Sequence, residues 1–226
     1  SAIKSYGIGI LVGREKRTTG AQYKLKDTEQ TLRFLEILSS SIEEGNIWSL
    51  AYSHYEPKEE KLREVLCALG NGYFVTRSAA TESHSDAIHY PGTYIAGGYN
   101  RLKTVIQEKE IINEDLVNFP NWLTLRFRID EGKWFSIDEM TILSYRQELD
   151  MQEGVLHKIV HFSDTKARET RIIERRLVHM GNKHMAAIEL TIMPINWKGS
   201  LEIESGIDGN IKNEGVERYR NLSNQH

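Results

Sequence analysis

The carboxyl-terminal half of the chain shows a pattern in which apolar and polar residues alternate, interrupted at short intervals by turn residues such as Asp130–Gly132 and Gly181–Asn182. Alternation of this kind gives each extended segment one apolar face, and it predicts half-buried β-strands. The predicted strands are Leu123–Ile129, Trp134–Ile137, Ile142–Tyr145, Val155–Phe162, Thr170–Val178, Ala187–Met193 and Leu201–Ile207. Short strands at this spacing predict a mainly β fold, a large antiparallel β-sandwich.

Residues 46–116 predict smaller elements and one long loop. Trp48–Tyr52 alternates as a strand, and Pro57 opens a short helix that ends at Gly70. The stretch Gly72–Thr76 is extended, whereas Arg77–Leu116 is rich in Gly, Ser, His and Tyr and has weak periodicity. This last stretch predicts a long ordered loop, and such loops inside compact domains are usually functional. The apolar residues that share one face of the helix are Leu62, Val65, Leu66 and Leu69.

The first 45 residues have a different character. The glycine-fenced apolar run Gly7–Gly13 predicts a strand buried on both faces, as in a parallel sheet, and Ala21–Leu25 predicts a second short strand. A helix with an apolar stripe is predicted from Asp27 to Ile42. A β-β-α segment of this size cannot close a core of its own. We therefore expect residues 1–45 to be a tail from a separate domain, and residues 46–226 to form the sandwich.

Composition and charge exclude several classes of function. The chain has 226 residues, 39% hydrophobic and 27% charged, with a formal net charge of -3. This balance gives no signal for nucleic acid or an anionic membrane. Cys67 is the single cysteine, which excludes an internal disulfide and a multi-cysteine zinc site. An apolar run of about 20 residues and a signal-peptide pattern are both lacking, so we expect a cytoplasmic protein.

Two groups of residues in the long loop suggest chemistry. Glu82, His84, Asp86 and His89 combine imidazole and carboxylate groups, which suit a divalent metal or proton transfer. Their spacing fits no metal motif, so a polar loop is favoured over a metal-dependent enzyme. The loop tyrosines Tyr90, Tyr94 and Tyr99 could instead stack on the apolar faces of sugar rings, which leaves an autonomous carbohydrate-binding module as an alternative function.

Several long motifs, in the correct order, carry a family resemblance. They are Gly70–Phe74, Thr76–Arg77, His89–Gly97, Glu114–Asn118, Pro120–Leu123, Tyr145–Asp150, Pro194 with Asn196–Trp197, Ser205 with Asp208–Gly209, and Val216 with Arg218–Arg220. Over residues 48–226 the chain resembles the N-terminal domain of glycoside hydrolase family 65. The resemblance departs at Ser78, where the family usually has glycine, so the turn at that position is uncertain.

The resemblance implies a β-sandwich that precedes an (α/α)6 catalytic barrel. The family comprises phosphorylases of maltose, trehalose, kojibiose and nigerose, and some hydrolases. In the phosphorylases a barrel glutamate protonates the glycosidic oxygen while inorganic phosphate, the co-substrate, attacks the anomeric carbon with inversion. Since this chain has no barrel, we expect it to hold no catalytic residue, metal or cofactor. Its expected partners are its own barrel, an α-linked glucose disaccharide in the longer enzyme, and a second copy in a homodimer.

The same resemblance gives candidate positions on the barrel-facing or substrate-facing surface. They lie in the most family-like loop and beside it: His89, Tyr90, Tyr94, Asn118 and Trp122. Internal packing of the loop is an equally good interpretation of these residues.

Residues 6–38 have a second resemblance, to the C-terminal end of a trehalose-6-phosphate phosphatase of the haloacid dehalogenase superfamily. The residues that carry it are Gly7–Gly13, Ala21–Leu25, Asp27 and Phe34–Leu35. It implies a fused polypeptide in which a phosphatase-like domain precedes the family 65 enzyme, and it favours trehalose metabolism.

Overall fold

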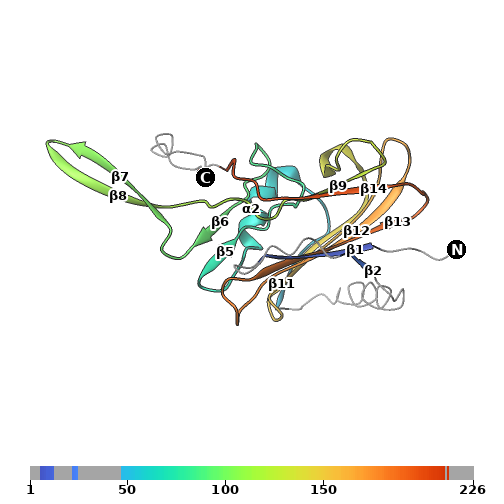
Figure 1. Ribbon diagram of the computed structural model, residues 1–226, viewed down its shortest axis with the longest axis horizontal. Coiled ribbons are helices and arrows are strands. Elements are labelled where there is room, and N and C mark those ends of the chain that lie inside the picture. Colours follow the sequence, from blue (N-terminus) through green and yellow to red (C-terminus); the bar gives the residue numbers. More distant parts are fainter. Residues whose placement is uncertain (1–5, 13–21, 25–46, 212, 214–226) are drawn as a thin grey trace. The chain divides into compact units, whose positions relative to one another are not determined.

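A computed structural model describes residues 6–12, 22–24, 47–211 and 213 (Figure 1). The helix predicted at 27–42 and the motif at 216–220 lie outside the described residues. The chain divides into two compact units, each described by itself below. Unit 1 comprises Ser1–Glu56 and Phe127–Glu202, and unit 2 comprises Pro57–Arg126 and Ile203–His226.

Unit 1 is built on a seven-stranded antiparallel sheet, which confirms the strands predicted at 142–145, 155–162, 170–178 and 187–193. The strand order is β2-β1-β13-β12-β11-β10-β3. Consecutive strands β10 to β13 pair as a meander, because each is joined to the next by a short turn. The bounds are β1 Tyr6–Val12, β2 Gln22–Lys24, β3 Ser49–Tyr52, β10 Thr141–Asp150, β11 Val155–Ser163, β12 Glu169–Val178 and β13 Ala186–Pro194.

One face of this sheet forms the core of unit 1. Alternate residues of β11 are buried, from Leu156 through Val160 to Phe162. The ring of Phe162 lies 4.8 Å from that of Phe135, which in turn stacks on Phe127 at 4.9 Å. Phe127 belongs to β9 (Leu125–Ile129), which pairs with β14 (Leu201–Ser205). A second layer thus packs on the sheet through aromatic rings, and the mainly β sandwich fold is confirmed.

The strand predicted at 7–13 forms as β1, but its setting differs from the prediction. β1 pairs antiparallel with β13 on one side and with β2 on the other. An apolar run reports how a strand is buried and carries no information on the direction of its neighbours, so the parallel setting was wrong. The boundary predicted at residue 45 stays a prediction, because most of residues 1–45 lie outside the described part of the chain.

Unit 2 contains the short helix and two small sheets. The helix predicted after Pro57 is confirmed as the 3-10 turn η1 (Pro57–Glu59) followed by α2 (Glu60–Leu66). A three-stranded sheet follows, formed by β4 (Leu69–Gly70), β5 (Phe74–Thr76) and β6 (Thr93–Ile95).

The stretch predicted as one loop, Arg77–Leu116, contains three strands. Besides β6, it forms a long two-stranded hairpin of β7 (Tyr99–Ile106) and β8 (Lys109–Leu116), here called the arm (Figure 1). The loop prediction was wrong for these segments because charged and polar residues occur along both strands of the arm and obscure the alternation that predicts a strand. Residues 77–92 have no strand or helix, as predicted.

A smaller correction concerns Trp134–Ile137, predicted as the second strand of a hairpin. The structure has one isolated bridge there, between Arg128 and Trp134, and then the 3-10 turn η2 (Ile137–Glu139). Among the described residues, no helix is both long enough and apolar enough to cross a membrane.

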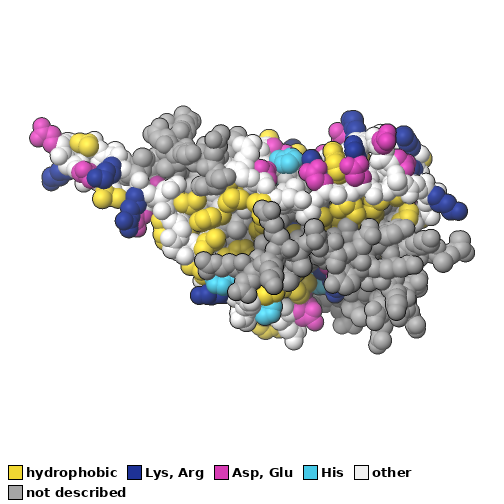
Figure 2. Space-filling model, viewed as in Figure 1, with side chains coloured by type: hydrophobic (Ala, Val, Ile, Leu, Met, Phe, Trp, Pro, Cys, Tyr) yellow, Lys and Arg dark blue, Asp and Glu magenta, His cyan; other side chains and the backbone are white. Residues whose placement is uncertain are grey.

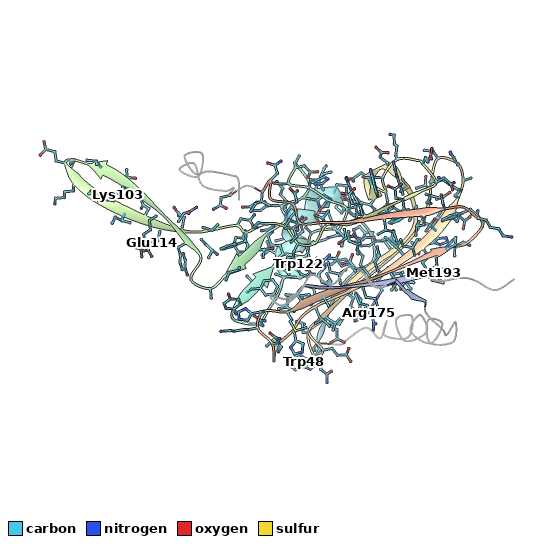
Figure 3. All side chains as sticks on the ribbon, viewed as in Figure 1. Trp48, Lys103, Glu114, Trp122, Arg175 and Met193 are labelled. Carbon is cyan, nitrogen blue, oxygen red and sulfur yellow. The ribbon has the colours of Figure 1, made fainter. Side chains whose placement is uncertain are left out.

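The arm is exposed and mixed in character. Figure 2 shows positive, negative and hydrophobic side chains along it, and Figure 3 labels Lys103 and Glu114. Val105 is 70% exposed and Ile112 is 53% exposed. The arm closes through two residues, Gln107 and Glu108, which both have positive φ, 50° and 65°. A two-residue turn with this geometry favours Asn and Gly, which are absent here.

We predict that Glu108→Gly stabilises the arm by about 1 kcal/mol, because a side chain in the left-handed region costs roughly 1–2 kcal/mol that glycine avoids. Slower hydrogen exchange of the β7 and β8 amides would measure this gain. Lys109→Gly, one residue later in an ordinary strand conformation, is the control and speeds exchange. Equal effects of the two variants would contradict the strain at Glu108.

We also predict that stability falls as pH decreases below neutrality. Burial, and then the charge of Arg175, lower the pKa of His157 below its ordinary value of 6.5, against raising contributions from three nearby carboxylates. The unfolded state therefore takes up a proton before the folded state does, and protonation favours unfolding. The His157→Gln variant should show a smaller drop in urea midpoint between pH 7 and pH 5. The exposed His54→Gln variant should keep the drop seen in the unmodified protein.

Candidate functional site

A buried carboxylate in unit 2 organises the loop that carries most of the predicted site residues. Glu64 lies on α2 with 1% of its surface exposed. Its Oε1 lies 2.9 Å from Nδ1 of His89, and its Oε2 accepts a hydrogen bond from the backbone N–H of Tyr90 at 3.0 Å. Nη2 of Arg77 lies 3.5 Å from the same Oε2. One carboxylate therefore joins the helix to both ends of the loop.

Arg77 fixes the other side of this arrangement. Its guanidinium donates to the carbonyl of Lys61 at 2.7 Å and lies 4.8 Å from the centroid of the Tyr90 ring, a cation–π contact. Its backbone N–H donates to the carbonyl of Gly92 at 2.8 Å. A Cβ at Gly92 would lie 2.6 Å from Cδ of Arg77 and 2.9 Å from the hydroxyl of Tyr94. Glycine is therefore required where the loop passes this side chain.

Asn118 holds the end of the loop and is fully buried. Its Oδ1 accepts from the N–H of Thr93 at 2.9 Å, and its Nδ2 donates to the carbonyl of Pro91 at 3.0 Å. The two bonds use both halves of the amide, so an aspartate or a leucine of similar size cannot replace it. Asn118 therefore fixes the backbone between the loop and β6.

Trp122, labelled in Figure 3, contacts Phe74 of β5. It is 8% exposed and packs edge-on against Phe74, with ring centroids 6.3 Å apart. Its indole N–H is buried without a hydrogen-bond partner in the described part of the chain. Trp122 is thus placed in the interior of unit 2, on the sheet that carries β5.

The five predicted site residues thus have different settings. His89, Asn118 and Trp122 are buried, whereas Tyr90 and Tyr94 are half-buried on the loop. Whether they face a barrel or a substrate stays a prediction. Glu64 was missed because Glu60, Arg63 and Glu64 recur at helical spacing and resemble an ordinary solvated face. Arg77 was located by the family motif Thr76–Arg77, but it was not named as a site candidate.

Asp86 and His84, from the polar cluster considered as a metal or proton-transfer site, have different partners. Oδ1 of Asp86 accepts from the backbone N–H groups of Ile88 and His89, at 2.8 and 2.6 Å, and so closes a turn within the loop. Nδ1 of His84 instead lies 3.5 Å from Asp208. Among the described residues, no group of three or more His, Cys, Asp or Glu side chains is arranged to hold a metal ion.

Ser78, where the resemblance departed, fits its position. Its N–H donates to the carbonyl of Glu64 at 2.8 Å, and its hydroxyl donates to the carbonyl of Cys67. The non-glycine residues with positive φ in the described chain are Gln107, Glu108, Asp130 and Ala167, so Ser78 does not need the freedom of glycine. The hydroxyl supplies a tie between the loop and the end of α2.

We predict that Glu64→Ala lowers the free energy of unfolding by about 3–5 kcal/mol, because Arg77 and His89 lose their buried partner. Glu64→Gln keeps one acceptor oxygen and should cost less, about 1–3 kcal/mol. Urea unfolding and amide exchange at residues 88–90 would measure both. Glu114→Ala, which removes an exposed ion pair with Arg101, is the control and should have little effect. Equal losses for Glu64→Ala and the control would contradict the role of this carboxylate.

Comparison with known proteins places the chain in a family. The family model described as glycosyl hydrolase family 65, N-terminal domain, matches residues 50–226. A glycosyl hydrolase of Mycobacterium tuberculosis, described as uncharacterized, is 39% identical over 232 residues, covering 100% of this chain and 18% of its own length. A kojibiose phosphorylase of Caldanaerobacter subterraneus is 33% identical over 174 residues, covering 76% of this chain and 21% of its own.

Two further comparisons agree. A trehalose 6-phosphate phosphorylase of Lactococcus lactis is 31% identical over 174 residues, covering 76% of this chain and 22% of its own. A solved structure of a provisionally assigned kojibiose phosphorylase from the human microbiome has a TM-score of 0.67 at 20% identity, over 74% of this chain and 22% of that one. The chain thus spans about a fifth of the length of these relatives. With the match over residues 50–226, the chain belongs to glycosyl hydrolase family 65 and contains its N-terminal domain.

Proposed function

We propose that this chain is the non-catalytic amino-terminal part of an enzyme that cleaves an α-linked glucose disaccharide by phosphorolysis or hydrolysis. The observation that carries the proposal is the match of residues 50–226 to the N-terminal domain of the family, in relatives about five times as long. The catalytic barrel implied by the resemblance belongs to the remaining part. In the phosphorolytic case inorganic phosphate is the co-substrate, and in either case the chain itself needs no cofactor.

The site geometry supports a structural role for the acidic residue nearest the loop. A general acid for glycosidic cleavage must donate a proton to the leaving oxygen. Glu64 is buried, and its two oxygens already serve His89, Tyr90 and Arg77. Its carboxylate is therefore suited to hold the loop in shape, and the proton must come from a residue of the barrel.

We propose that the loop at residues 77–94 forms part of the wall near the mouth of the active site in the longer polypeptide. Tyr90 and Tyr94 are half-buried and supply its outer surface, while His89 and Asn118 fix the backbone beneath it. Trp122 packs against Phe74 of β5 and so supports the three-stranded sheet that flanks the loop. We also propose that two copies of the longer polypeptide associate as a homodimer.

Trehalose metabolism is the favoured pathway. The relative from Lactococcus lactis is named a trehalose 6-phosphate phosphorylase, and two others are named trehalose phosphorylases. The relative from Mycobacterium tuberculosis aligns over the whole chain, including the segment that resembles a trehalose-6-phosphate phosphatase. A phosphatase-like domain before the family 65 domain, in a cytoplasmic fusion protein, would link two steps that act on trehalose compounds.

A carbohydrate-binding module remains the second candidate, favoured by the half-buried tyrosines of the loop. Arg77 contacts the Tyr90 ring at 4.8 Å, and aromatic rings held in this way are the groups on which sugars stack. Titration calorimetry of the isolated chain with millimolar trehalose, maltose and kojibiose tests this candidate. Measurable heat that is lost in Tyr90→Ala and Tyr94→Ala would favour a binding module.

We predict that the chain alone releases no product from trehalose, maltose, kojibiose or nigerose, with or without phosphate. The longer polypeptide should convert one of them to glucose and β-glucose 1-phosphate, because attack by phosphate inverts an α-linkage. NMR of the product anomer and a glucose assay measure this. Glucose release that does not require phosphate would assign hydrolysis. No cleavage of any α-glucoside by the longer polypeptide, or cleavage by the chain alone, would overturn the proposal.

A further inference from the structure

The helix α2 has its charged and apolar faces reversed with respect to an ordinary surface helix. Its buried residues are Glu60, Arg63 and Glu64, which are 3%, 2% and 1% exposed. Its apolar residues point outward: Leu62 is 59% exposed, Val65 48% and Leu66 49%. These three recur at i, i+3 and i+4, so they form one continuous stripe. An amphipathic helix normally buries that stripe.

The reversal has a free-energy cost on both faces. The buried charges must be taken out of water, and they are retained because Arg63 pairs with Glu59 at 2.7 Å while Glu64 is held by the loop. The outward leucines gain nothing from burial as long as water covers them. A helix of seven residues has little stability of its own, so its conformation depends on contacts on both sides.

We propose that the outward stripe of α2, formed by Leu62, Val65 and Leu66, is the surface on which the catalytic portion of the longer polypeptide docks. This inference rests on the function proposed above and names the surface that it requires. The partner must present an apolar groove for three aliphatic side chains along about 10 Å of helix. About four-fifths of the length of the relatives lies outside this segment, and that length can supply the groove.

The size of the stripe favours this partner over a second copy of the chain. Burying one aliphatic side chain removes on the order of 100 Å² from water, and three that are half covered already offer on the order of 150 Å² more. A stable dimer needs about 800 Å² from each partner. A portion of the same polypeptide needs less, because covalent connection supplies a high effective concentration.

Docking at α2 would also set the position of the loop at residues 77–94. The inner face of the same helix holds that loop through Glu64, and the carbonyl of Lys61 accepts from Arg77. A shift of α2 on its partner is therefore passed to Tyr90 and Tyr94 through buried hydrogen bonds. α2 is thus a positioning element, with the docking surface outside and the loop anchor inside.

The test compares the isolated chain with the longer polypeptide. Amide exchange at residues 62–66 should be at least about tenfold slower in the longer polypeptide, because docking protects the helix. The variant Leu62→Asp/Leu66→Asp should remove this protection and expose the junction between the two portions to protease. In the isolated chain the same variant should fold with an unchanged urea midpoint and bind less hydrophobic dye, which separates loss of docking from loss of folding.

Turnover gives a second readout. Leu62→Asp/Leu66→Asp should lower kcat/KM for the disaccharide by about tenfold or more, since a displacement of about 1 Å at a wall of the active site is costly. Val105→Asp on the exposed arm is the control and should keep the activity and protection of the unmodified enzyme. If the longer polypeptide cleaves no disaccharide, the proposed function fails while the exchange data still report docking.

Three results would overturn the docking proposal. Equal exchange at residues 62–66 in the isolated chain and the longer polypeptide would show that α2 is not covered. Retention of the protection in Leu62→Asp/Leu66→Asp would show that the stripe is not the contact. A dimer of the isolated chain in sedimentation, converted to a monomer by the same variant, would assign the stripe to a second copy.

Discussion

The loop at residues 77–94 depends on a single buried charge, the carboxylate of Glu64. Glu64 is 1% exposed, so protein groups must replace the water that its carboxylate oxygens would otherwise bind. Two of its contacts, with His89 and the N–H of Tyr90, lie at the far end of the loop, and the third, with Arg77, lies at its start. The requirement to satisfy one charge therefore closes a loop of more than ten residues onto a helix.

The closed loop explains several residues of the family motifs that lie within it. Gly92 is needed because Arg77 passes close to its Cα, and Pro91 and Thr93 are fixed by Asn118. Pro91, Gly92 and Thr93 thus serve the path of the backbone, whereas Tyr90 and Tyr94 are half-buried. A wall of an active site needs the same combination, a fixed backbone with a few side chains outside it.

The sequence predicted the central strands of unit 1 well because buried residues recur along them, most regularly in β11. Leu156, Val160 and Phe162 recur every second residue, and this period survives in the sequence whatever the neighbours are. The arm was missed because charged pairs such as Arg101–Glu114 and Lys103–Glu110 stand along its strands and interrupt the alternation of apolar and polar residues. The family motifs contain the candidate residues His89, Tyr90, Tyr94, Asn118 and Trp122, and whether these face a barrel or a substrate stays a prediction. The part played by Glu64 was beyond such reasoning, because its partner lies 25 residues away and a charged helical face usually meets solvent.

The two-residue turn of the arm also bears on the order of folding. Closure at Gln107 and Glu108 is unfavourable without glycine, so pairing of β7 with β8 cannot easily start at the tip. It can start at the base, where the N–H of Val117 donates to the carbonyl of Gly98 at 3.1 Å, beside the three-stranded sheet. From there each added pair closes only a small loop. The rest of unit 2 would then fold first, and β7 would pair with β8 from the base of the arm towards its tip.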